Sequence, residues 1–163
     1  QVAKIREIED SKMEHLNLYD FAEKATYNII ALAQNAEAVI YNEIEEDLCV
    51  KGKAAYLDSI ILNFLTNAIK YRAEGRNPII ELSSYVEADF VVLKIKDNGL
   101  GIDLKKFGDT VFQMYKTFHH NEDAIGIGLF ITKNHIESLG GRVEIVSEVG
   151  VGTEFSVYLK KAS

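Results

Sequence analysis

Three polar residues lie on a helix that is mostly apolar. Asn63, Asn67 and Lys70 follow one another at helical spacing within NFLTNAIKYR, residues 63–72. Asparagine is a weaker helix former than Glu, Lys or Gln, so two asparagines in register indicate a demand other than helix stability. Amide oxygens suit Mg²⁺, which takes hard oxygen ligands, and a lysine supplies a positive point charge for a phosphate. The alternative is that these amides cap a neighbouring loop or face water.

Two glycine-containing segments could complete a nucleotide site. Asp97 begins DNGLG, residues 97–101, and an ionised carboxylate there would accept a hydrogen bond from an exocyclic amine such as that of adenine. AIGIGL, residues 124–129, is typical of a helix start that binds phosphate through its N–H groups. Neither segment matches a Rossmann or Walker phosphate loop. Taken singly, the first is better explained as a glycine turn and the second as an ordinary helix start.

Helices and strands that would position these residues follow from the hydrophobic pattern. A long helix over residues 54–73 has one apolar face at three- and four-residue spacing, formed by Leu57, Ile60, Ile61, Phe64, Leu65 and Ala68. Further helices are predicted over residues 20–34, capped by Asp20, and over residues 126–139. Strands are predicted over residues 16–18, 38–45, 48–51, 79–86, 90–96, 142–147 and 153–159, with the acidic turn 45–47 joining the second to the third. This order predicts an α+β two-layer sandwich, with a mixed, mostly antiparallel sheet and helices on one face.

Composition narrows the class of protein. The 163 residues suit a single domain, with 47% hydrophobic and 26% charged residues. The net charge of −7 argues against general binding to nucleic acid or anionic lipid. Cys49 is the single cysteine, and no apolar segment is long enough to span a membrane. We expect a cytoplasmic domain without direct membrane contact. A chain that begins at Gln1 is expected to come from a longer protein, either membrane-anchored or soluble.

Five segments, in order, resemble the sequence boxes of the ATP-binding catalytic domain of sensor histidine kinases, in the Bergerat or GHKL superfamily. These segments resemble the N box at residues 63–71, the G1 box at 97–102, the F box at 111–116, the G2 box at 126–129 and the closing glycine–threonine turn at 150–155. The similarity extends from about residue 16 to residue 159. It implies a Bergerat fold, with ATP between helices and a flexible lid. Residues 15–163 would form this domain, and residues 1–14 the end of a preceding dimerisation module or a linker.

The resemblance also implies roles for individual residues. Asn67 would ligate Mg²⁺, with Asn63 beside it near the metal and the phosphates. Lys70 would contact the phosphates and, together with Lys116 of the lid, would complete the catalytic group. Asp97 would bind the adenine amino group. The other residues that the resemblance places at the nucleotide are Tyr71, Gly99, Gly101, Ile102, Gly126, Gly128, Leu129 and Thr153.

The lid implied by the resemblance covers residues 116–124 and departs from the family pattern twice. Lys116 stands where arginine is common, and lysine offers a point charge instead of a planar fork. Ala124 stands where the first glycine of the G2 box is often found, so a stiffer hinge is expected. Neither departure removes the metal ligand or the adenine anchor.

The position of Asn63 separates two activities within the superfamily. ATP-hydrolysing members carry a glutamate that activates water four residues before the metal-binding asparagine, and this chain has Asn63 there. Because an amide cannot serve as a general base, the resemblance favours phosphoryl transfer over hydrolysis. Remaining alternatives are a degenerate nucleotide-binding or regulatory module, another ATPase of the superfamily, and a protein-serine kinase of the anti-sigma type.

The histidine that accepts the phosphoryl group is expected on another domain. No acidic residue follows His15, His119 and His120 fall in the implied lid, and His135 lies on the last predicted helix. The implied partners are the protein's own dimerisation and histidine phosphotransfer domain and a response regulator. The full protein would be a homodimer, and this fragment by itself a monomer.

Overall fold

A five-stranded sheet forms the centre of the computed structural model, which describes residues 12–107, 112 and 125–162. The strand order is β2 (Val39–Glu43), β4 (Ile79–Glu87), β5 (Phe90–Asp97), β7 (Gly152–Lys160) and β6 (Arg142–Glu148). β2 runs parallel to β4, and every other pair is antiparallel. The predicted mixed, mostly antiparallel sheet is therefore confirmed.

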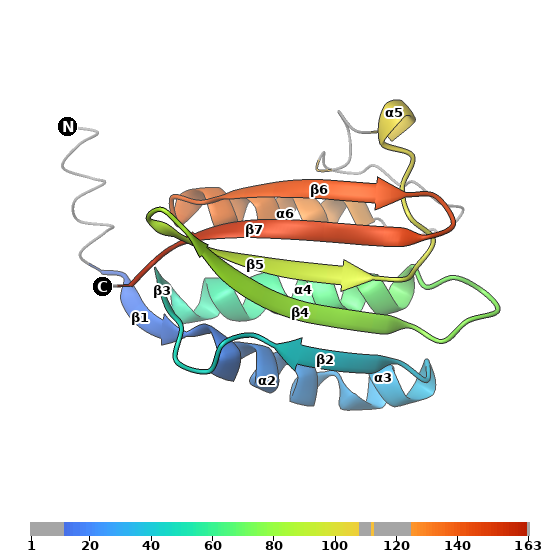
Figure 1. Cartoon of the computed structure of the whole chain (residues 1–163), viewed down its shortest axis with the longest axis horizontal. Coiled ribbons are helices and arrows are strands. Elements are labelled where there is room, and N and C mark those ends of the chain that lie inside the picture. Colours follow the sequence, from blue (N-terminus) through green and yellow to red (C-terminus); the bar gives the residue numbers. More distant parts are fainter. Residues whose placement is uncertain (1–11, 108–111, 113–124, 163) are drawn as a thin grey trace.

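Helices cover one face of this sheet (Figure 1). They are α2 (Leu18–Asn28), α3 (Ile30–Asn35), α4 (Ala54–Lys70) and α6 (Ile125–Ser138). The central helix, α4, buries the apolar face that its sequence predicts, and Phe64 packs against Phe155 of β7 with 4.7 Å between ring centroids. None of the helices among the described residues is long and apolar enough to cross a membrane.

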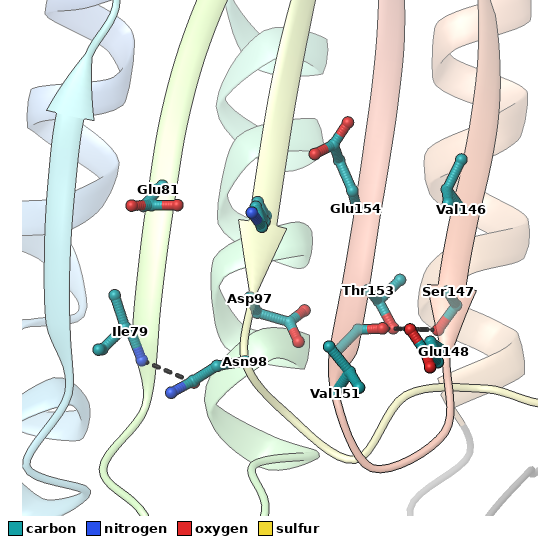
Figure 2. Close-up of a pocket in the computed structure, with 12 residues that line it drawn as sticks. Ile79, Glu81, Asp97, Asn98, Val146, Ser147, Glu148, Val151, Thr153 and Glu154 are labelled. Carbon is teal, nitrogen blue, oxygen red and sulfur yellow. Dashed lines mark hydrogen bonds between the residues drawn. The ribbon is translucent and has the colours of Figure 1, made fainter.

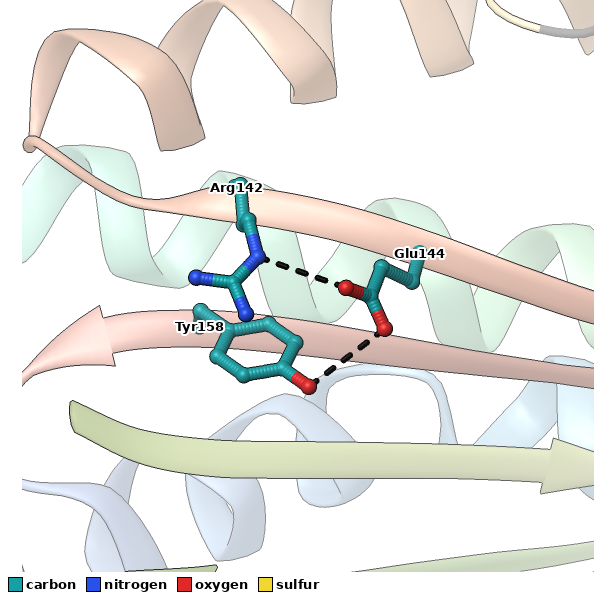
Figure 3. A network of polar contacts seen from close by, with 3 residues as sticks. All are labelled: Arg142, Glu144 and Tyr158. Atoms are coloured by element: carbon teal, nitrogen blue, oxygen red, sulfur yellow. Dashed lines mark hydrogen bonds and ion pairs between the residues drawn. The ribbon is translucent and has the colours of Figure 1, made fainter. Parts of the chain in front are cut away.

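Strand alternation divides the sheet into a core face and an open face. On β5, Val91, Leu93 and Ile95 are buried in the core, whereas Lys94 and Lys96 project to the other side. The open face carries polar networks in place of helices. In one of them the Arg142 guanidinium carbon lies 3.7 Å from the centre of the Tyr158 ring. The Glu144 carboxylate accepts hydrogen bonds from both side chains (Figure 3).

The predicted acidic turn joins strands 38–45 and 48–51, with the Leu48 N–H donating to the Glu45 carbonyl at 3.3 Å, but the two strands belong to different sheets. β2 joins the main sheet, whereas β3 (Cys49–Gly52) pairs antiparallel with β1 (Glu14–Asn17). The side chain of Asn42 accepts a hydrogen bond from the Ile44 N–H at 3.2 Å and turns the chain away after β2. Val50 of β3 is then buried opposite Leu16. Burial of these side chains explains the pairing with β1.

The predicted helix over residues 20–34 is also wrong in two details. Asn17 caps α2 in place of Asp20, since its side chain accepts a hydrogen bond from the Asp20 N–H at 3.0 Å. The helix is interrupted at Ile29 and continues as α3. The Thr26 hydroxyl, one turn before the interruption, donates to the Ala22 carbonyl at 2.9 Å, a type of bond that often bends helices.

Two further differences lie near the polar residues of interest. The long helix ends at Lys70, three residues before the predicted end, and the Arg72 guanidinium caps it by donating to the Ile69 carbonyl at 2.9 Å. A short helix that was not predicted, α5 (Leu104–Phe107), follows the glycine loop after β5. Asp103 caps it by accepting from the N–H groups of its second and third residues.

Candidate nucleotide site

A small cavity lies between the C-terminal half of α4 and the adjoining ends of β5 and β7. Its volume is about 30 Å³, and it is lined by Asn67, Ala68, Tyr71, Asp97, Leu100, Gly101, Ile102, Thr153 and Phe155. Six residues that the resemblance places at the nucleotide thus meet in one cavity on the helical side of the sheet. They come from α4 and the residue after it, from the end of β5 and the loop that follows, and from the start of β7.

Asp97 is the last residue of β5, and its carboxylate is held by the backbone. The Gly99 N–H donates to its Oδ1 at 2.8 Å. Burial raises the pKa of Asp97 above its ordinary value of 3.8, and hydrogen bonds from the Gly99 and Thr153 N–H groups act in the opposite direction. The carboxylate is therefore a fixed hydrogen-bond acceptor at the wall of the cavity.

Asn67 has a buried amide nitrogen without a hydrogen-bond partner among the described residues. An unsatisfied buried polar group costs about 1–3 kcal/mol, so an amide in this state indicates a function besides folding. Rotation of the amide by 180° exchanges its nitrogen and oxygen, so either atom can face the cavity. The amide oxygen is a hard ligand of the kind Mg²⁺ takes. The residue present thus fits a metal ligand.

Asn63 and Lys70 belong to the same helix but do not line this cavity. The Asn63 amide donates to Thr132 of α6 at 3.0 Å and to Ser59 at 3.5 Å, and Thr132 is fully buried. Asn63 therefore links α4 to α6 across the helical layer. Lys70 is the exposed last residue of α4, with its Nζ 5.8 Å from the centre of the Tyr71 ring.

The glycines after β5 have a structural reason of their own. Gly101 has a φ of +73°, and a Cβ there would collide with the Glu148 carbonyl of β6. A Cβ at Gly99 would lie 2.7 Å from the Tyr71 carbonyl oxygen. Both glycines let the loop approach the protein's own backbone. Of the two, Gly101 also lines the cavity.

Ser147 of β6 supports the cavity from behind and was missed by sequence reasoning. Its hydroxyl accepts from the Ile102 N–H at 2.7 Å. It also donates to the Gly152 carbonyl at 3.0 Å and bonds the Thr153 hydroxyl at 2.7 Å, both residues of the start of β7 (Figure 2). A signal was present, because Ser147 takes the inward place that Val143 and Ile145 occupy earlier on the same strand.

The phosphate side of the implied site is described only in part. Gly126 and Gly128 lie in the first turn of α6, and Leu129 is fully buried in the core. Lys116, with the whole predicted lid 116–124 and its two histidines, lies outside the described residues. Within residues 12–107, 112 and 125–162, no group of three or more His, Cys, Asp or Glu is placed to hold a metal ion.

A much larger cavity, of about 700 Å³, opens on the other face of the sheet (Figure 2). Glu81, Lys96, Val146 and Glu154 project into it from four neighbouring strands. It shares strand ends with the small cavity, but strand alternation sends the side chain of Asp97 to the helical side. Asp97 and Thr153 line both cavities, whereas Asn67 and Tyr71, which the resemblance also assigns to the nucleotide, line only the smaller of the two.

Comparison with known proteins identifies the family. Residues 52–163 match the family of histidine kinase-, DNA gyrase B- and HSP90-like ATPases. The sensor histidine kinase RcsC of Escherichia coli K12 is 31% identical over 137 residues, which cover 81% of this chain and 14% of RcsC. The chain thus spans about a seventh of that relative.

Solved structures show the same fold. The catalytic domain of the histidine kinase ThkA has a TM-score of 0.79 at 20% identity, over 93% of this chain and 99% of that domain. Full-length ShkA in complex with AMPPNP has a TM-score of 0.77 at 19% identity, over 93% of this chain and 32% of ShkA. The chain belongs to the histidine kinase-, DNA gyrase B- and HSP90-like ATPase family, as a catalytic ATP-binding domain of two-component sensor histidine kinases.

Proposed function

We propose that this domain transfers the γ-phosphoryl group of ATP to a histidine on the dimerisation domain of its own protein. The observation that supports this most is the meeting, in one cavity, of the Asp97 carboxylate and the Asn67 amide, whose nitrogen has no partner in the described part of the chain. The first is an acceptor for an adenine amino group, and the second a ligand for a metal on the phosphates. ShkA, a structural neighbour, was crystallised with AMPPNP.

In the proposed placement, adenine lies beside the end of β5, and the phosphates lie along the C-terminal end of α4. Asp97, supported by Thr153, receives the adenine amino group, and the buried Tyr71 packs beside the base. Lys70, at the end of α4, contacts the phosphates. Asn67 holds Mg²⁺, which when bound neutralises charge on the phosphates. The domain thus contributes mainly positioning and charge neutralisation, which suffice for phosphoryl transfer to an external nucleophile.

The arrangement around Asn63 favours transfer over hydrolysis. Its amide is engaged by Thr132 and Ser59, and it has no basic group with which to activate water. The nucleophile must then come from another domain. The proposed partners are accordingly the dimerisation and phosphotransfer domain of a homodimeric parent protein and a response regulator, in the cytoplasm.

The proposal is tested by phosphoryl transfer in trans. The chain is mixed with the purified dimerisation domain of its parent protein and ATP labelled on the γ-phosphate. We expect acid-labile label on that domain, lost when its acceptor histidine is replaced by glutamine and strongly reduced with Asn67→Ala in this chain. Steady release of free phosphate by the chain alone, without transfer to the histidine, would contradict the proposal.

A further inference from the structure

Arg76 joins two loops that are far apart in the sequence. It lies in the loop between α4 and β4, and its guanidinium donates to four backbone carbonyl oxygens. Nε donates to Asn98 at 2.7 Å, and one terminal nitrogen donates to Gly99 and Gly150 at 2.9 Å and to Val151 at 3.4 Å. The first two carbonyls belong to the loop after β5, and the other two to the turn between β6 and β7.

The chemistry of this junction requires a guanidinium. Four carbonyl oxygens carry partial negative charges and point towards one cation, so removal of that cation leaves them to repel one another. A guanidinium presents its donors in a rigid plane and reaches both loops at once. A lysine ammonium lacks the second donor nitrogen that lets arginine bond the Asn98 carbonyl through Nε while a terminal nitrogen bonds the other three oxygens. Asn98 is additionally fixed, because its side chain accepts from the Ile79 N–H at 2.8 Å (Figure 2).

The loop that Arg76 holds is also a wall of the small cavity. Asp97 precedes this loop, and Leu100 and the two residues after it line the cavity. The Leu100 N–H donates to the Tyr71 carbonyl at 3.0 Å, and the Leu100 carbonyl accepts from the Gly150 N–H at 2.8 Å. A shift of the loop therefore moves Asp97 and the apolar wall together.

We infer that Arg76 is a positioning residue for adenine recognition: it clamps the loop 98–102 to the turn 149–151 and so fixes the Asp97 carboxylate and the wall beside it. Arg76 does not itself line the cavity, so it acts through the loop and not on the nucleotide. The inference rests on the proposed function, since it requires adenine in this cavity. Arg76 lies outside all five sequence boxes, so the resemblance assigns it no role.

The test compares Arg76→Ala with Arg72→Ala. Arg72 is a matched control, because it caps α4 through the Ile69 carbonyl, which belongs to neither loop. We expect Arg76→Ala to weaken AMPPNP binding and to raise the KM for ATP in transfer by roughly tenfold, the effect of losing charge-assisted hydrogen bonds, with kcat unchanged. Arg76→Lys should lose less affinity, and methylguanidine should restore binding to Arg76→Ala alone. Amide hydrogen exchange of residues 98–102 should accelerate in Arg76→Ala.

The outcomes separate this inference from the proposed function. If the unchanged chain binds AMPPNP and Arg76→Ala binds it equally well, the inference is wrong and the proposed function stands. Equal losses in Arg76→Ala and Arg72→Ala, without rescue by methylguanidine, would mean a general loss of stability and would also overturn the inference. If the unchanged chain fails to bind AMPPNP, the proposed function fails and the inference fails with it.

Discussion

Replacement of Asp97 by asparagine tests the proposed adenine contact with little change in shape. The asparagine side chain of this variant can keep the hydrogen bond from the Gly99 N–H, now 2.8 Å from Oδ1, through its amide oxygen. Its amide nitrogen then faces the amino group of adenine, so two donors oppose each other. A hydrogen bond to a charged group contributes about 1.5–3 kcal/mol, and its loss therefore weakens ATP binding by roughly 10- to 150-fold.

The same substitution should have the opposite effect on folding stability. Burial raises the pKa of Asp97, so the folded protein holds this proton more tightly than the unfolded chain does. The corresponding contribution to stability is present below the ordinary pKa of 3.8 and is lost as the pH rises through the raised pKa. Ionised Asp97 therefore lowers stability at pH 7, and asparagine removes that cost. We expect Asp97→Asn to melt at a higher temperature than the unchanged chain at pH 7, with the difference shrinking as the pH falls towards 4.

Calorimetry with AMPPNP and Mg²⁺, and thermal denaturation at several pH values, measure the two effects. Asp89→Asn is the matched control, because Asp89 is exposed in the turn at the opposite end of β5. It should change neither affinity nor melting temperature appreciably. Affinity of Asp97→Asn within twofold of the unchanged chain would refute the adenine contact. A loss of affinity accompanied by a lower melting temperature at pH 7 would refute the explanation by burial.

Three other predictions follow from particular contacts. Asn67→Ala should abolish the gain in AMPPNP affinity that Mg²⁺ provides, measured by calorimetry with and without the metal, and a persisting gain would exclude Asn67 as the ligand. Phe64→Ala, which removes a side chain 2% exposed and packed on Phe155, should lower the free energy of unfolding in urea by about 3–5 kcal/mol; a loss below 1 kcal/mol, roughly the scale of a surface change, would contradict the packing. Nucleotide affinity should fall on acidification with a midpoint above 3.8, the ordinary pKa of Asp97, and a midpoint at or below that value would contradict its burial.

The helical layer and the alternating strands could be predicted because their signals are local. The apolar positions of α4 recur at helical spacing, and the structure buries all six of the predicted ones. β5 and β7 likewise alternate or run apolar in a way that identifies strands. Strand pairing was harder to predict from the sequence. β2 and β3 are separated by a short turn, yet β2 pairs with β4 and β3 pairs with β1. That choice depends on which distant side chains bury Val50 and Leu82, and periodicity carries no information on it.

Part of the candidate site could be predicted from the sequence, and part of it could not. The resemblance brought Asn67, Tyr71, Asp97 and Thr153 together before the fold was known, and the structure places them around one cavity. Arg76 gave no signal, because an arginine in a polar loop is indistinguishable from an ordinary exposed one until its four carbonyl partners are seen. The hydrogen bond from Asn63 to Thr132 could not be predicted either, since it joins two residues that are 69 positions apart in the sequence.

The face of the sheet on which the nucleotide binds is the most direct test of the proposed site. Backbone amide chemical shifts of the chain would be followed by nuclear magnetic resonance during titration with AMPPNP and Mg²⁺. We expect the largest changes at Asn67, Leu100 and Phe155 around the small cavity, with little change at Glu81 and Val146 on the open face. Changes concentrated at Glu81 and Val146 would place the ligand in the larger cavity and contradict the proposed site.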